Sequence, residues 1–97
     1  MISVYRPSEF EWDKGNTGKN KKHGIEDPES EEAFLDGNKV ILKDAVHSAA
    51  EERLILLGKT KPGKLLYIVF TIRKNRIRIV SARRVNKKEV FLYEKAD

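Results

Sequence analysis

The distribution of apolar residues in the second half of the chain predicts three antiparallel strands. Residues 65–73 are almost continuously apolar, and residues 76–83 alternate apolar with charged or small side chains. Both segments are rich in β-branched residues, which is typical of strands. The dipeptide Lys74-Asn75 predicts a tight turn between them. Residues 52–59 fit either a strand or a helix, but the turn Lys61-Pro62-Gly63-Lys64 favours a strand and therefore a meander.

The first half of the chain has a weaker pattern, in which one short helix is the clearest element. Asp27 is a suitable N-cap, Pro28 suits the first helical position, and the acidic residues that follow favour the positive end of the helix dipole. We predict that this helix ends at about Leu35. The other predicted elements are an edge strand at residues 2–5 that Phe10 and Trp12 extend, a helical segment at 14–23, a strand at 40–42, a polar connection at 44–50 and a helix after Asn86.

The two-residue period of a strand predicts which side chains share a face. In residues 65–73 one set is wholly apolar and is predicted to face the core: Leu66, Ile68, Phe70 and Ile72. The other set places Tyr67, Thr71 and Arg73 on the more accessible face, where a phenol, a hydroxyl and a guanidinium are suited to contact a nucleotide. In residues 76–83 the same period separates Arg78 from Arg83, and the pattern does not decide which of the two faces is the core face.

The composition predicts one α+β domain over residues 1–97. A chain of this length buries enough surface for one core, and the 36% of charged residues fits a soluble domain with a polar surface. The absence of cysteine excludes disulfides, thiolate metal sites and cysteine nucleophiles. Apolar runs are too short to cross a bilayer, and the first residues lack the layout of a signal peptide, so we expect a cytoplasmic protein.

Charge is distributed unevenly along the chain. The net charge is +5, and residues 59–97 contain 12 basic and 3 acidic residues. Residues 26–36 contain 6 acidic residues and no basic ones. Such a field steers a polyanion toward one side of a molecule, which favours a nucleic acid as the partner.

Arginines inside two neighbouring strands are the main chemical signal. Arg73, Arg78 and Arg83 interrupt otherwise apolar segments. A guanidinium stays charged at physiological pH and binds two phosphate oxygens at once, so these residues predict a sheet face that binds phosphate. The alternative is that they are solvated or paired with glutamates. The glutamates considered for such pairs are Glu51, Glu52 and Glu89.

Four further residues are candidates for proton transfer or for structural roles. His23 follows two lysines, which favour its neutral form, and it suits phosphodiester chemistry unless it is only a surface histidine in a basic patch. The spacing of His47 from Asp44 fits a hydrogen bond that stabilises a turn. Glu51 and Glu52 begin a predicted strand, and either one suits a general base. Metal binding has little support, because the histidines lack ligand spacing.

Taken in order, these motifs resemble the BrnT family, small ribonuclease toxins of bacterial type II toxin-antitoxin pairs. The segments that carry the resemblance are Phe10-Glu11-Trp12-Asp13, Lys22-His23-Gly24-Ile25, Glu32-Ala33-Phe34-Leu35-Asp36, Asp44-x-x-His47-Ser48-x-x-Glu51-Glu52-Arg53, Gly58, Phe70-Thr71-Ile72-Arg73, Ile77-Arg78-Ile79-Val80-Ser81-Ala82-Arg83 and Glu89-x-x-x-Tyr93. The resemblance implies a RelE-like α+β fold, with a twisted antiparallel meander of three to four C-terminal strands and short helices mainly on one face. It also implies RNA cleavage without metal or cofactor, and a BrnA-like antitoxin that masks the toxin and supplies the DNA-binding part.

The resemblance also implies roles for particular residues. The expected catalytic residues are His23, Glu52, Arg73 and Arg83, with Glu51 as the alternative to Glu52. The expected RNA-binding residues are Lys21, Lys22, Thr71 and Arg84. The expected reaction is attack of a ribose 2′-hydroxyl on the adjacent phosphodiester, which inhibits translation and growth until the antitoxin binds. A non-catalytic nucleic-acid or partner-binding module with a basic sheet face is the alternative.

Overall fold

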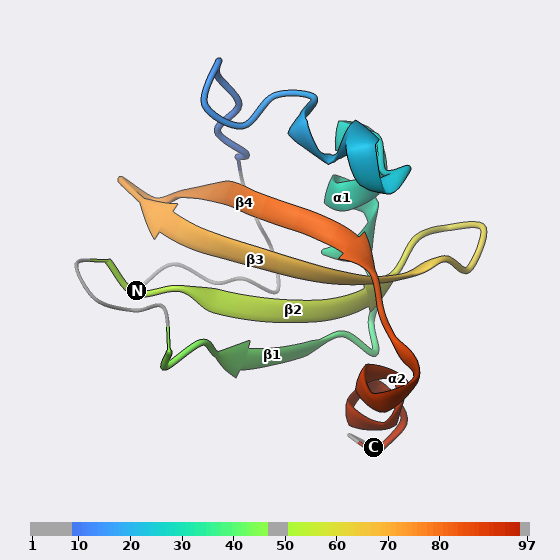
Figure 1. The fold of residues 1–97 in the computed structure, drawn as a ribbon. Coiled ribbons are helices and arrows are strands. Elements are labelled where there is room, and N and C mark those ends of the chain that lie inside the picture. Colours follow the sequence, from blue (N-terminus) through green and yellow to red (C-terminus); the bar gives the residue numbers. More distant parts are fainter. Residues whose placement is uncertain (1–8, 47–50, 96–97) are drawn as a thin grey trace.

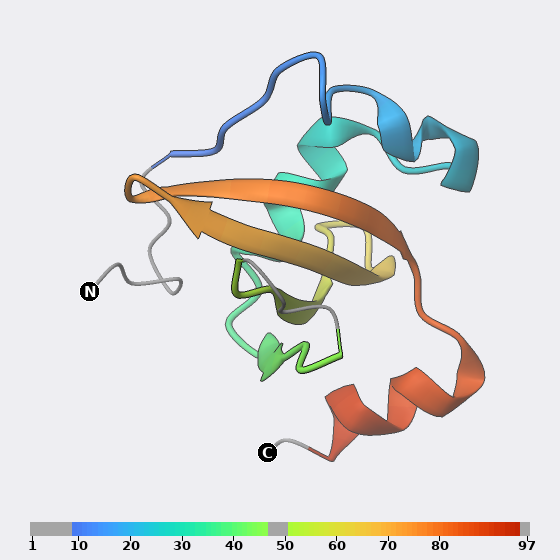
Figure 2. The same ribbon diagram turned by 60° about the vertical axis from the view of Figure 1, so that its left-hand side comes forward.

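The apolar segments of the second half form most of a four-stranded antiparallel sheet (Figure 1). In the computed structural model, which describes residues 9–46 and 51–95, the strands lie in the order β1-β2-β3-β4. The strands are β1 (Val40–Lys43), β2 (Leu54–Lys59), β3 (Leu65–Arg73) and β4 (Arg76–Arg84), and the helices are the 3-10 helix η1 (Lys19–His23), α1 (Asp27–Ala33) and α2 (Lys87–Glu94). The helices η1 and α1 lie on one side of the sheet and α2 lies on the other (Figure 2). The predicted α+β class and the meander are confirmed.

The strand predictions differ from the structure mainly at their ends. The segment that fitted either a strand or a helix is the strand β2, and it begins at Leu54 rather than at Glu52. Lys74 and Asn75 have φ angles of 49° and 65°, the left-handed pair that a two-residue hairpin turn requires. The predicted edge strand at residues 2–5 lies outside the described residues, as does His47.

The first half of the chain departs further from the prediction. The predicted N-cap Asp27 is instead the first residue of α1, and Glu26 is the N-cap, with its backbone N–H donating to the Glu29 side chain at 2.9 Å. The Asp27 carboxylate accepts from the backbone N–H of Gly18 at 3.0 Å, so it joins the helix to the preceding loop. The helix ends at Ala33, before the predicted end, and the segment 14–23 is helical only as η1.

The hydrophobic core lies between α1 and one face of the sheet. The residues predicted to face the core from β3 are buried or partly buried there: Leu66, Ile68, Phe70 and Ile72. Phe34, directly after α1, packs edge-on against Phe70 and Phe10, with ring centroids 5.0 and 5.2 Å apart. A Cβ atom at Gly58 would collide with the carbonyl oxygen of Ala33, so glycine allows β2 and α1 to approach this closely.

A β-bulge changes which residues of β4 share a face. Val69 pairs with Ser81, but the next residue Phe70 pairs with Ile79, so Val80 has no partner in the ladder. Such an extra residue reverses the alternation of side chains beyond it. Ile77, Ile79 and Ala82 therefore all face the core. Arg78 lies opposite Thr71 and Arg83 opposite Tyr67, which puts both arginines on the same face. The predicted separation of Arg78 from Arg83 is wrong for this reason.

The N-terminal segment covers the outer edge of β4. Ile77 accepts a backbone hydrogen bond from Glu11 at 2.8 Å and donates one to Glu9 at 3.0 Å. The side chain of buried Asn16 donates to the carbonyl of Ile79 at 3.1 Å, and the backbone N–H of Ala82 donates to buried Asn20 at 2.9 Å. These contacts satisfy the edge groups that an outer strand otherwise exposes. No helix within residues 9–46 and 51–95 has the length and apolar character needed to cross a membrane.

Candidate functional site

The face of the sheet opposite α1 contains a pocket of about 310 Å³, which we call the sheet pocket. Its lining residues are Asp44, Arg53, Tyr67, Val69, Val80, Ser81 and Arg83. Val80 and Ser81 are adjacent in the sequence, and both reach the pocket because the bulge interrupts the alternation of β4. The pocket combines guanidinium, phenol, hydroxyl and carboxyl groups in a volume at the lower end of the range for small-molecule sites.

Arg83 is held on three sides. Its Nη1 and Nη2 donate to the two carboxylate oxygens of Glu89 at 2.8 and 2.7 Å. Nη1 also donates to the carbonyl of Arg84 at 3.1 Å. The guanidinium carbon lies 4.1 Å from the centroid of the Tyr67 ring, which is a cation–π contact across the β3–β4 pair.

The charges of this group stabilise one another. The hydrogen bond to Glu89 raises the pKa of Arg83, and the same bond from Arg83 lowers the pKa of Glu89. Burial raises the pKa of the Tyr67 phenol, so this side chain is neutral at physiological pH. Arg83 and Glu89 therefore carry opposite full charges over the whole physiological range.

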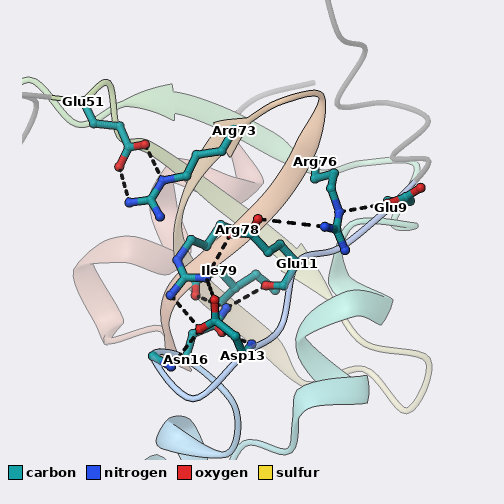
Figure 3. A network of polar contacts seen from close by, with 10 residues as sticks. Glu9, Glu11, Asp13, Asn16, Glu51, Arg73, Arg76, Arg78 and Ile79 are labelled. Atoms are coloured by element: carbon teal, nitrogen blue, oxygen red, sulfur yellow. Dashed lines mark hydrogen bonds and ion pairs between the residues drawn. The ribbon is translucent and has the colours of Figure 1, made fainter.

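Arg73 is also paired, but at the other end of the sheet. Its Nε and Nη2 donate to the Glu51 carboxylate at 2.6 and 2.9 Å (Figure 3). The hydrogen bond from Arg73 lowers the pKa of Glu51, which makes this carboxylate a weaker base. Glu52, its neighbour, is exposed and lies 3.5 Å from the ammonium of Lys43. Of the two glutamates, Glu52 therefore has the looser contact.

Thr71 does not occupy the accessible position that the sequence predicted. Its side chain is 1% exposed, and its hydroxyl donates to the backbone carbonyl of Glu52 at 2.8 Å. The segment that leads into β2 covers it. Thr71 therefore joins β3 to the start of β2, and its predicted contact with RNA is not consistent with this burial.

A group of acidic residues neutralises the remaining arginines at the β3–β4 turn. Arg78 donates to Glu11 at 3.0 Å and to both carboxylate oxygens of Asp13, and its side chain is only 14% exposed. Arg76 pairs with Glu9 at 2.8 Å. Figure 3 shows these carboxylates, all from the N-terminal segment, pointing toward β4. Arg78 thus fastens that segment to the sheet.

The predicted site residues fall into two groups. Arg73 and Arg83 are on the same face, but Arg83 lies opposite Tyr67, six residues before Arg73 on β3, and this corresponds to roughly 20 Å of strand. The η1 helix, with exposed Lys21, Lys22 and His23, packs on β4, and its Asn20 binds the backbone of Ala82 next to Arg83. Arg84 is exposed at the same end. The glutamates 51 and 52 lie nearer to Arg73.

A comparison with family models gives one match. The model of BrnT, the ribonuclease toxin of a type II toxin-antitoxin system, matches residues 12–89. The chain belongs to the BrnT family. A comparison with curated proteins gave no match. Membership indicates a ribonuclease toxin, and it implies an RNA target and an antitoxin partner.

The sheet pocket of this BrnT chain includes residues that sequence reasoning did not select as site residues. The sequence pattern places Tyr67 on the accessible face as a nucleotide contact but not among the expected site residues, and it does not indicate Asp44, Arg53 or Ser81 as parts of a site. The alternation of β3 gave the only signal for Tyr67. Ser81 shares a face with Arg83 by the ordinary alternation of β4, whereas Val80 reaches the pocket because of the bulge. Within the described residues, no three His, Asp or Glu side chains gather as they would around a metal ion.

Proposed function

We propose that this chain is a metal-independent endoribonuclease toxin that cleaves RNA by attack of a ribose 2′-hydroxyl on the adjacent phosphodiester. The observation that carries the proposal is a guanidinium, Arg83, that is held by Glu89 and Tyr67 in the wall of a solvent-open pocket on the sheet face opposite α1. A fixed cation beside the phosphate stabilises the charge that develops in the transition state. Cleavage of this kind inhibits translation and growth until an antitoxin of the BrnA type binds.

The strand distance gives Arg83 and Arg73 different tasks. About 20 Å of strand lies between them, which is too far for both guanidiniums to contact one phosphate. We assign Arg83 to the scissile phosphate. Arg73 then binds a phosphate further along the same RNA strand. This phosphate replaces the Glu51 carboxylate as the partner of the Arg73 guanidinium.

Proton transfer is assigned to His23 and Glu52. Cleavage by a 2′-hydroxyl needs a base for that hydroxyl and an acid for the departing 5′-oxygen. His23 ends η1, which packs on β4. Glu52 precedes Arg53, a lining residue of the pocket, and its carbonyl accepts from Thr71, which lies between Tyr67 and Arg73 on β3. Glu52 is preferred over Glu51 because Arg73 lowers the pKa of Glu51.

The exposed basic residues beside Arg83 complete the proposed RNA surface. Lys21 and Lys22 on η1, together with Arg84 at the end of β4, are exposed around the same end of the sheet. Such side chains bind the RNA backbone through its charge and give little sequence selectivity.

The test is cleavage of a labelled RNA by the purified protein in excess chelator. We expect products with a 5′-hydroxyl and a 2′,3′-cyclic phosphate, and no cut where a 2′-deoxynucleotide replaces the nucleotide before the mapped site. Arg83→Ala should abolish most of this cleavage, whereas Arg76→Ala, which removes an exposed arginine paired with Glu9, should not. RNA that is bound but left intact would instead support a binding module.

A further inference from the structure

The structure points to a role for Tyr67, a residue with no assigned function. We propose that Tyr67 and Glu89 together position Arg83 so that one edge of its guanidinium is presented to a substrate phosphate in the sheet pocket. This inference rests on the proposed function, because it concerns the same phosphate. Tyr67 and Glu89 act through Arg83 and are positioning residues.

The hydrogen bonds of Arg83 leave one edge of the guanidinium available. A guanidinium has five N–H donors in a fixed plane. Both hydrogens of Nη1 are engaged, by Glu89 and by the carbonyl of Arg84, and one hydrogen of Nη2 is engaged by Glu89. The remaining two donors, on Nε and Nη2, lie side by side along the long edge. Within residues 9–46 and 51–95 no acceptor is hydrogen-bonded to that edge.

The exposure of the pair indicates which partner is fixed. The Glu89 side chain is 15% exposed, whereas the Arg83 side chain is 38% exposed. Glu89 also accepts from the backbone N–H of Asn86 at 2.9 Å, and Asn86 accepts in return from the Glu89 N–H at 2.9 Å. This capping box fixes Glu89 at the start of α2. Glu89 thus holds Arg83 in place. It does not compete with a substrate phosphate for the long edge, since it binds only the tip of the guanidinium.

Tyr67 supplies the second constraint. Tyr67 lies directly across the β3–β4 pair from Arg83, and the guanidinium carbon lies over its ring, 4.1 Å from the ring centroid. Glu89 alone fixes the tip of the group but leaves the plane free to tilt, and an aromatic ring beneath it restricts that tilt. The ion pair at the tip and the ring contact therefore restrict both the position and the orientation of the free edge, which is the requirement for two parallel hydrogen bonds to a phosphate.

The experiment compares Tyr67→Phe and Tyr67→Leu by two readouts. The first is the Nε–H resonance of Arg83 in ¹⁵N-labelled protein during titration with inorganic phosphate and with a 2′-O-methyl RNA that cannot be cleaved. The second is kcat and KM on cleavable RNA. Phenylalanine retains the ring, so we expect both readouts to stay near those of the original protein. Leucine removes the ring, and we expect the resonance shift to be lost and kcat to fall on the order of 100-fold.

A double-variant cycle separates positioning from general damage. If Tyr67 acts through Arg83, Tyr67→Leu adds little to the loss already caused by Arg83→Ala. Additive losses, or equal losses for phenylalanine and leucine, would overturn the inference. The two proposals can also fail separately. If phosphate shifts the Arg83 resonance only when the Tyr67 ring is present, but the protein cuts no RNA, the inference stands and the proposed function is contradicted.

Discussion

Two arginine–glutamate pairs at opposite ends of one sheet face use different edges of the guanidinium. At the α2 end Glu89 binds the tip of Arg83 through Nη1 and Nη2. At the β3–β4 turn Glu51 binds the long edge of Arg73 through Nε and Nη2. The first pairing leaves the long edge of the arginine available, and the second occupies it. The two ion pairs therefore differ in which N–H donors of the arginine remain for a phosphate.

The surroundings of the two pairs strengthen this difference. Arg83 stacks on Tyr67, and its glutamate is fixed by the capping box of α2. The Arg73 and Glu51 side chains are 48% and 35% exposed. Exposed pairs of this kind contribute little free energy and exchange readily with solvent or other ions. Arg83 is built into the fold, whereas Arg73 is free to exchange its partner for a phosphate.

Removal of the fixed arginine is expected to have the largest effect. Arg83→Ala removes a preorganised charge from the proposed position of the scissile phosphate, and losing one such group is expected to lower kcat by roughly 100- to 1,000-fold. Arg73→Ala should change mainly KM, because the phosphate that we propose it binds lies away from the reacting bond. Steady-state cleavage of a single labelled RNA measures both. Equal losses of kcat in the two variants would contradict the assignment of different tasks to Arg83 and Arg73.

The two neighbouring glutamates give the next largest expected difference. Glu52→Gln removes the proposed base and should lower kcat by about 100-fold. Glu51→Gln weakens only the contact with Arg73, so kcat should stay within about threefold of the original value. The reverse order would make Glu51 the base. Both changes are isosteric, and each serves as the control for the other.

Lysine substitutions separate charge from geometry at each end. Lysine retains the positive charge but lacks the planar fork of arginine. Arg83→Lys should therefore lower kcat by about tenfold or more, because two parallel hydrogen bonds to one phosphate are lost. Arg73→Lys should leave kcat unchanged and preserve the salt dependence of RNA binding, which depends on the charge alone. A fully active Arg83→Lys variant would mean that only charge matters at the α2 end.

The sequence predicted the strands well because their signals are local. The apolar runs and the Lys74-Asn75 turn fix β3 and β4 without help from the rest of the chain. The helix start was displaced by one residue because Glu26 and Glu29 form the capping contact that Asp27 was expected to make, while Asp27 binds a distant loop. That contact depends on the tertiary structure and has no local signature.

The candidate site was harder to predict because it depends on register. A single unpaired residue, Val80, puts Arg78 on the face of Arg83 and itself reaches the pocket beside Ser81. Alternation along one strand contains no sign of this bulge. The sequence is compatible with a pairing of Arg83 with Glu89, but the edge of the guanidinium that Glu89 occupies follows only from atomic positions.

The smallest expected effect concerns how α2 is held at its other end. Tyr93 donates to the Asp36 carboxylate at 2.6 Å, and burial together with this hydrogen bond raises the pKa of Tyr93 to about 12. Because the folded value lies above the ordinary value of 10.0, the bond contributes its full stability below pH 10 and loses it as the pH rises toward 12. Tyr93→Phe should lower the free energy of unfolding by about 1 kcal/mol at neutral pH.

The pH dependence of that loss is the decisive measurement. Urea unfolding at several pH values between 8 and 12 should show the original protein losing its advantage over Tyr93→Phe above pH 10, since the variant has no phenol to ionise. A constant difference across this range would mean that the hydrogen bond to Asp36 does not hold α2. Loosening of α2 should also lower the kcat of Tyr93→Phe slightly, because Glu89 on the same helix positions Arg83. The contribution of Arg73 to KM should not change, because Arg73 lies at the other end of the sheet.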